Sequence, residues 1–216
     1  MGAAGGQDGM YIGAMSKLSL QPEPDSGLVK RATDAILNMI SVVPISEEFK
    51  TDFPEKRARQ LARTAARASA GISGGAALAP GPLGILTLLP DIIGVWRVQA
   101  QMVSDIAAAY GKSASVTQEQ MVYCLFKHTA SQLFRDIVVR SGERYLVRPV
   151  SLRMMQSLVA MIGVKVGQRT LGKAVARYAP VVGAMGVGAY AYYDTQQVAK
   201  TAISLFSHTI DVVVDE

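Results

Sequence analysis

Two stretches of this 216-residue chain contain basic residues but no acid, and each leads into an apolar run rich in glycine. They are residues 56–90 and residues 144–193. Together they hold 12 of the 22 lysines and arginines, so the rest of the chain is net acidic. Apolar runs of this length are either buried in a protein core or placed in lipid, because a large exposed apolar surface is unfavourable in water. The pattern therefore predicts a basic face next to covered, glycine-rich segments.

The overall composition is that of one folded domain. A chain of 216 residues can bury a full core, and 50% of its residues are hydrophobic. The mean hydropathy is +0.23, and only 18% of the residues are charged. Cys124 is the sole cysteine, which excludes an intrachain disulfide. Residues 1–26 are rich in small residues and proline, so we expect a flexible N-terminal tail before a single α-helical domain over residues 27–212.

Apolar residues recur at helical spacing along most of this domain, and few segments alternate as strands do. We predict an all-α fold, a multi-helix bundle with Gly/Pro-rich apolar helical hairpins. The expected helices cover about residues 26–43, 54–79, 91–111 and 118–140, with another that starts at Pro149 and a last one that runs through Ile210. Residues 54–111 and 149–210 show the same order of features, which suggests two weakly similar halves.

Local signals set the expected helix ends and contacts. Pro44 should stop the first helix, and Gly111 should end the third. Thr117 and Gln120 form a capping box, and Ser141-Gly142 marks a turn. Small residues are expected to let helices approach closely. These are Gly71 and Gly75 in the first half and Gly163 and Gly167 in the second.

Each acid-free stretch carries four cations on a single helix face. At 100° per residue, the first four fall within an arc of about 80°, and the second four recur at every fourth position, so that their stripe drifts by about 40° per step. They are Lys56, Arg59, Arg63 and Arg67 in the first stretch and Lys165, Arg169, Lys173 and Arg177 in the second. A cationic helix face beside an apolar segment is typical of proteins that bind anionic lipid headgroups. A basic face that is simply solvated is the ordinary alternative.

The apolar runs leave three arrangements open. Residues 68–90 are uncharged over 23 positions, long enough to span a bilayer, yet Pro80-Gly81-Pro82 interrupts them. Residues 178–193 are uncharged over only 16 positions. A hairpin that dips into the bilayer, a core inside a soluble bundle and a true span are all compatible with the sequence. Aromatic residues near the runs are expected either at a lipid interface or in the core. They are Trp96, Tyr178, Tyr190, Tyr192 and Tyr193.

No catalytic or cofactor motif is complete, so we predict no enzyme activity, no metal and no cofactor. Gly111-Lys112-Ser113 resembles the end of a phosphate-binding loop, but Ile106 occupies the position of the first glycine. Cys124 and His128 share a helix face without further ligands, which favours a buried thiol beside a capped or surface imidazole.

Two isolated acids follow the apolar runs. Asp91 is expected to cap a helix, and Asp91 and Asp194 are also candidates for a polar pair or a proton site inside the bundle. Aromatic residues make up 6% of the chain and do not interleave with the cations, which argues against a nucleic-acid partner.

Two segments resemble signatures of the EcsC family. The first comprises Leu89-Pro90-Asp91-Ile92-Ile93, Gln99-Ala100-Gln101-Met102 and Ile106-Ala107-Ala108-Ala109-Tyr110-Gly111; the second comprises Ala179-Pro180-Val181-Val182-Gly183-Ala184, then Thr195 and Val198-Ala199. The match covers about residues 60–205 and is also similar to a helical domain that accompanies certain bacterial GTPases. The resemblance implies a bacterial, membrane-associated helical protein with no established catalytic activity. A GTPase partner would be a separate chain.

These observations lead to one main hypothesis and two alternatives. We predict a non-enzymatic helical protein that binds anionic membrane lipids through both cationic faces, on the cytoplasmic side of the inner membrane, as a peripheral or re-entrant protein. The first alternative is a soluble module that docks an acidic protein. The second is an enzyme, acting on lipid for example, which requires polar groups to converge around Asp91, Asp194 or His128. A membrane protein or a GTPase is a further expected partner.

Overall fold

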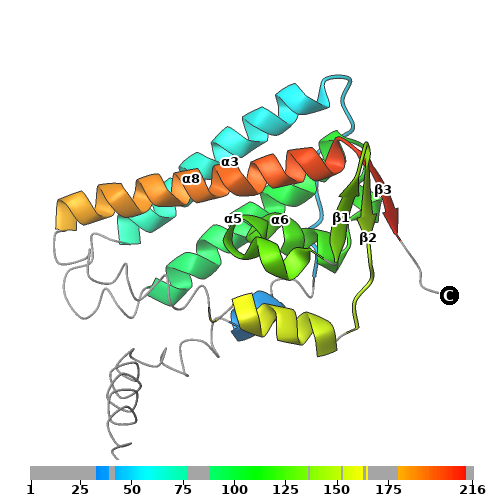
Figure 1. The fold of residues 1–216 in the computed structure, drawn as a ribbon. Coiled ribbons are helices and arrows are strands. Elements are labelled where there is room, and N and C mark those ends of the chain that lie inside the picture. Colours follow the sequence, from blue (N-terminus) through cyan, green and yellow to red (C-terminus); the bar gives the residue numbers. More distant parts are fainter. Residues whose placement is uncertain are drawn as a thin grey trace, which may run out of the picture.

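The computed structural model describes residues 33–38, 42–76, 88–135, 137–151, 153–162, 164 and 180–212. Most of them are helical, and a small sheet lies at one end of the helices (Figure 1). The long helices are α3 (Pro54–Ala76), α5 (Leu88–Ala109), α6 (Gln118–Ala130) and α8 (Pro180–Phe206), and residues 33–38 and 153–162 are also helical. The predicted helical character is confirmed, whereas the expected Gly/Pro-rich hairpins fall largely outside the described residues.

Helices α3 and α8 lie side by side and run in opposite directions (Figure 1). Gln196 on α8 donates a hydrogen bond to the carbonyl of Ala62 on α3, at 3.2 Å. Nearer the other end of this contact, a Cβ atom placed on Gly188 would lie 3.2 Å from the carbonyl oxygen of Ala70. The inner face of α3 is made of small buried residues: Ala58, Ala62, Ala65, Ala66, Ser69 and Ser73. Small side chains therefore allow the two helix backbones to approach closely.

The glycines that mediate this approach are not those expected from the sequence. Gly71 and Gly75 are exposed, and a Cβ atom on either would have nothing within 4 Å. Gly188 of α8, with Gly74 of α3 opposite, makes the close contact instead. Helical spacing alone does not tell which face of a glycine-rich helix meets a neighbour, because glycine has no side chain whose hydrophobicity would mark the buried face.

Helix α5 packs against α3 and runs parallel to α8. Gln99 in its middle is hydrogen-bonded to Thr195 of α8, and Lys112 just beyond its end donates to the backbone carbonyl of His208 just beyond α8. On its other side, Gly94 faces the side chain of Ile72 on α3. This helix thus lies where side chains from α3, α6 and α8 meet.

Two predicted helix ends are confirmed. Gly111 has φ +73°, and the amides of Gly111 and Lys112 donate to the carbonyls of Ala108 and Ala107, which is the Schellman pattern at the end of α5. Thr117 caps α6, since its hydroxyl accepts from the Gln120 amide while the Gln120 side chain accepts from the Thr117 amide. Both ends were readable because each needs only residues that are adjacent in the sequence.

Large side chains fill the core around α6. The ring of Phe126 meets Trp96 of α5 edge to face, with the centroids 5.5 Å apart. Tyr123 packs in the same way against Phe134 and Tyr145. Trp96 is therefore a core aromatic, whereas other flanking aromatics are exposed: Tyr190, Tyr192 and Tyr193.

A small three-stranded sheet, which the sequence did not predict, accompanies the helices. Strand β1 (Val138–Ser141) pairs antiparallel with β2 (Arg144–Val147), and β3 (Thr209–Val212) pairs parallel with β2 on its other side. The predicted helix over 118–140 is α-helical to Ala130, continues as a 3-10 helix over Ser131–Phe134, and is wrong beyond it. The last helix ends at Phe206 rather than running through Ile210. Gly142, with φ +59°, stands first in the two-residue connection between β1 and β2, as a type II′ hairpin turn requires.

The helix expected to start at Pro149 begins slightly later. The hydroxyl of Ser151 accepts a hydrogen bond from the amide of Met154 at 3.3 Å, which is N-cap geometry, and residues 148–151 are not helical. Pro149 precedes the helix instead of occupying its first turn. The helical residues 153–162 bury an apolar stripe: Met155, Leu158, Val159 and Ile162.

Several predictions fall outside the described residues. These are the tail 1–26, the closest helix approach at Gly163 and Gly167, the side chain of Asp91, and Tyr178. Among the helices of the described residues, none combines the length and apolarity needed to cross a bilayer.

Candidate functional site

The cationic face of α3, defined as Lys56, Arg59, Arg63 and Arg67, points away from the packed core. All four side chains are exposed, while Ala58, Ala62, Ala65 and Ser69 on the opposite side are buried against neighbouring helices. The arrangement follows from the helical repeat, which separates positions 56, 59, 63 and 67 from the small residues between them. The structure therefore brings the first predicted group of cations together on one surface.

Acidic side chains compensate part of this surface. Glu55 is paired with Arg59 at 2.5 Å, and Glu48 is paired with Arg57 at 2.5 Å. Both acids precede residue 56 in the sequence, so the acid-free stretch is partly neutralised by residues that lie just before it. In the described part of the chain, Lys56, Arg63 and Arg67 form no ion pair with an acid. These three cations are the ones that remain available to an anionic partner.

The second predicted group of cations lies outside the described residues. It comprises Lys165, Arg169, Lys173 and Arg177. Its participation in the same surface remains a prediction from the sequence.

A second candidate is a polar cluster inside the bundle, which we call the polar node: Gln99, His128, Asp194 and Thr195. Nε2 of His128 in α6 donates to Oδ1 of Asp194 in α8 at 2.8 Å. Nε2 of Gln99 in α5 donates to Oδ2 of Asp194 at 3.0 Å and to Oγ1 of Thr195 at 3.1 Å. The node joins three helices, and its two ionisable side chains are less than one fifth exposed.

The polar node realises the convergence around Asp194 and His128 that an enzyme would need. An aspartate that accepts from one ring nitrogen orients the histidine and leaves the other nitrogen as a potential base. Here the other nitrogen, Nδ1, is buried and has no hydrogen-bond partner among the described residues. A substrate cannot reach a ring nitrogen that is buried in the core. In this geometry the pair links α6 to α8.

Cys124 lies one turn before His128 and is fully buried, as expected for a structural thiol. Burial raises the pKa of the Cys124 thiol well above its ordinary value, so it stays protonated at neutral pH. A protonated, inaccessible thiol is neither a nucleophile nor a metal ligand. No three histidine, cysteine or acidic side chains group as metal ligands within the described ranges.

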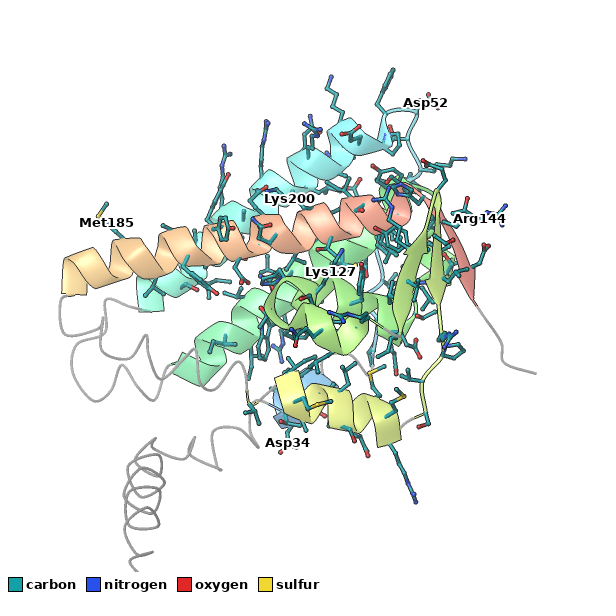
Figure 2. All side chains as sticks on the ribbon, in the orientation of Figure 1. Asp34, Asp52, Lys127, Arg144, Met185 and Lys200 are labelled. Carbon is teal, nitrogen blue, oxygen red and sulfur yellow. The ribbon has the colours of Figure 1, made fainter. Side chains whose placement is uncertain are left out.

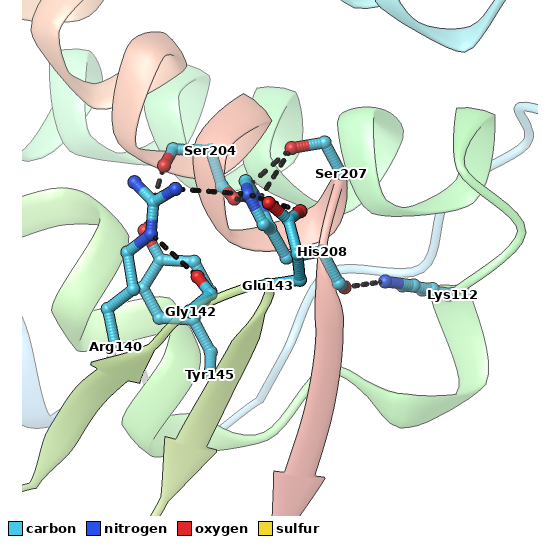
Figure 3. Close-up of polar contacts among 8 residues, drawn as sticks. All are labelled: Lys112, Arg140, Gly142, Glu143, Tyr145, Ser204, Ser207 and His208. Carbon is cyan, nitrogen blue, oxygen red and sulfur yellow. Dashed lines mark hydrogen bonds and ion pairs between the residues drawn. The ribbon is translucent and has the colours of Figure 1, made fainter.

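A third polar cluster surrounds His208 at the top of the sheet (Figure 3). Nδ1 of His208 lies 2.6 Å from the carbonyl oxygen of Ser204, and the Ser207 hydroxyl lies 3.0 Å from the same nitrogen. Nε2 faces the Arg140 guanidinium at 3.4 Å and the carboxylate of Glu143 at 3.7 Å. The order serine, histidine, glutamate resembles a catalytic triad.

The hydrogen-bond directions exclude that interpretation. Because Nδ1 lies against a carbonyl oxygen, it must carry its proton and donate, so it has no lone pair to accept the proton of Ser207. The Ser207 hydroxyl instead donates to the Ser204 carbonyl at 3.2 Å. A serine is activated only by a base that accepts its proton. The cluster therefore fixes the end of α8 to the hairpin.

Lys112, the lysine of the incomplete phosphate-loop motif, belongs to this cluster. Its ammonium group donates to the carbonyl of His208 (Figure 3). Gly111, the residue before it, forms the C-terminal cap of α5. Burial lowers the pKa of Lys112. A lysine already engaged by a backbone carbonyl at a helix C-terminus does not form a phosphate site, which needs a helix N-terminus.

Comparisons of the chain with protein-family models, with curated proteins and with solved structures found no match.

Proposed function

We propose that this protein binds anionic membrane surfaces peripherally, through the cationic face of α3. The observation that carries the proposal is the exposure of Lys56, Arg63 and Arg67 on one side of a helix whose other side is packed against α5 and α8. Within the described residues none of the three has an acidic partner. A preformed, unpaired row of cations suits a flat anionic surface.

The expected strength follows from the number of free cations. Each lysine or arginine near a membrane with anionic lipids contributes about 1 kcal/mol, so three such residues give weak, reversible binding. The resemblance to the EcsC family, which implies a membrane-associated protein, is compatible with this setting. We accordingly place the protein on the cytoplasmic side of the inner membrane, without a catalytic role.

Vesicle binding tests the proposal directly. We expect the full chain to float with vesicles of phosphatidylcholine and phosphatidylglycerol at low salt, and to dissociate at high salt, because salt screens exposed charges. The double variant Arg63→Glu/Arg67→Glu should bind about tenfold more weakly or worse. The matched control is Arg153→Glu/Lys200→Glu, which makes the same change in net charge at two exposed positions of other helices.

The two variants separate this proposal from its alternatives. Equal weakening in both would mean that only net charge matters, and the assignment to α3 would be wrong. Full binding by Arg63→Glu/Arg67→Glu would also overturn it. If the wild-type chain ignores vesicles of every composition, the chain is not a lipid binder, and an acidic protein partner becomes the leading alternative.

A further inference from the structure

Residues 42–53, which we call the strap, lead into α3 without regular secondary structure. Several bonds hold the strap against the bundle: Ser46 Oγ donates to Asp105 at 2.7 Å, Gln101 Nε2 donates to the carbonyl of Ile45 at 3.1 Å, and the Thr51 amide donates to the carbonyl of Ala109 at 3.2 Å. The Lys50 side chain lies over Gly111, where a Cβ atom would be only 2.8 Å from its Cδ. The backbone of the strap is therefore fixed at both its middle and its end.

The strap nevertheless turns large apolar side chains outward. Their exposed fractions are 71% for Val42, 89% for Ile45, 85% for Phe49 and 73% for Phe53. The other three phenylalanines of the chain, Phe126, Phe134 and Phe206, are buried. Removing a phenylalanine side chain from water is favourable, so a fixed backbone that exposes two of them is suited to a partner that covers them.

The strap is continuous with the cationic face of α3. Phe53 directly precedes Pro54, the first residue of α3, and Lys56 follows within one turn. Asp52, beside Phe53, lies at the end of the strap where the chain enters α3 (Figure 2). Glu48 is neutralised by Arg57, and the two exposed acids of the strap, Glu47 and Asp52, are outnumbered by cations that form no ion pair in the described chain: Lys50, Lys56, Arg63 and Arg67. An apolar pair beside free cations matches the boundary between anionic headgroups and acyl chains.

We infer that Phe49 and Phe53 insert into the lipid interface while the cationic face of α3 binds the headgroups. This inference rests on the proposed function and adds a lipid-inserted anchor to it. Because hydrogen bonds already hold the strap, its backbone does not have to become ordered on binding. The favourable free energy of burying the two rings is therefore not offset by a loss of backbone entropy. Ring insertion adds a contribution to binding that salt does not screen, beside the electrostatic contribution of the three cations.

Fluorescent labelling locates the two side chains. Single variants Phe49→Cys and Phe53→Cys are labelled with an environment-sensitive nitrobenzoxadiazole dye, and Cys124 stays unlabelled because it is buried. Met154→Cys, an exposed position on the helix 153–162, is the control site. Addition of phosphatidylcholine–phosphatidylglycerol vesicles should shift the dye emission to the blue at positions 49 and 53, and should leave it unchanged at position 154.

Affinity gives an independent measure. Phe49→Ala/Phe53→Ala should lower the vesicle partition coefficient by about tenfold or more, and it should keep the salt dependence of the wild-type chain. The control Met154→Ala/Met161→Ala removes two other exposed apolar side chains and should bind like the wild type. All four positions are exposed, so circular dichroism should show unchanged folds.

The outcomes separate the inference from the proposed function. If the wild-type chain binds vesicles in a salt-dependent way but positions 49 and 53 stay in water and the alanine pair binds normally, the inference is wrong and the electrostatic proposal stands. If the wild-type chain does not bind, both are wrong. If the wild type is a dimer in solution and the alanine pair is a monomer, the rings belong to an interface between two copies, and insertion is overturned.

Discussion

The contact between α3 and α8 and the region around α6 achieve burial in different ways. Along α3 the buried residues are alanine and serine, and Gly188 brings the α8 backbone within contact distance of the Ala70 carbonyl. Around α6 the space is filled by large rings and by the polar node. The α3–α8 contact depends on small side chains that let the backbones approach. The region around α6 depends on the volume of large rings and on hydrogen bonds between polar groups.

This difference explains where the surface chemistry is located. The inner side of α3 consists of small residues, so its backbone packs closely against α8. Its outer side takes no part in this packing and carries four exposed cations in a row. Helix α6 has no such division, since its large side chains are buried on most sides. The contrast predicts opposite responses to mutation: added volume should damage the α3–α8 contact, and lost groups should damage the region around α6.

The largest effect is expected from Asp194→Ala in the polar node. The substitution removes the acceptor of the His128 ring and one of the two acceptors of Gln99, and leaves donors in a mostly buried site. We expect the free energy of unfolding to fall by about 3 kcal/mol, measured by urea denaturation. A matched change outside the node is Asp211→Ala, whose exposed pair with Arg144 should cost less than about 1 kcal/mol.

A double-mutant cycle sharpens this prediction. His128→Ala/Asp194→Ala should lose less stability than the sum of the two single variants. Each single variant leaves the other member of the pair without its partner, whereas the double variant removes both members. Strict additivity would contradict a direct link between α6 and α8.

A smaller effect is expected from added volume in the α3–α8 contact. Gly188→Val places a branched side chain against the Ala70 carbonyl oxygen, a backbone atom that cannot rotate away. We expect a loss of about 2 kcal/mol in the free energy of unfolding. Gly71→Val is the control, because it adds the same group to the exposed side of α3 and should be neutral or slightly stabilising. Similar losses in both variants would mean that close backbone approach is not what holds this contact.

The sequence predicted the features of this fold that depend on neighbouring residues. The helical character, the start of α3 at Pro54, the end of α5 at Gly111 and the cap at Thr117 all follow from short patterns. The sheet did not, because strands of four residues are too short to show a period, and β3 pairs with a strand more than 60 residues earlier. The Val138-Val139 pair before the Ser141-Gly142 turn was the available signal for the hairpin.

The candidate sites divide in the same way. Exposure of Lys56, Arg63 and Arg67 was predictable from helical periodicity, whereas the pairing of Arg59 depended on Glu55, one residue outside the stretch considered. Asp194 and His128 are 66 residues apart, and no local pattern joins them. Phe49 and Phe53 are exposed on a segment held by hydrogen bonds between the strap and α5, which are contacts distant in sequence, so their sequence positions gave no indication of exposure.

The smallest effect concerns Cys124, which fills space in α6 and contributes no polar contact in the described structure. In the unfolded chain the thiol ionises near its ordinary pKa of 9.0, while burial raises the pKa in the folded chain. Above pH 9 the unfolded state therefore binds fewer protons than the folded state, and the free energy of unfolding must fall as the pH rises. The slope attributable to Cys124 is about 1.4 kcal/mol per pH unit once the unfolded thiol is ionised, and it vanishes below about pH 8.

Urea denaturation of the wild type and of Cys124→Ala between pH 7 and 10 measures this slope. At pH 7 the variant should have the lower free energy of unfolding, because it loses buried volume, and this free energy should decline less steeply as the pH rises. Parallel curves would show that the thiol is accessible to water in the folded protein, and that α6 is less tightly packed than its buried side chains indicate.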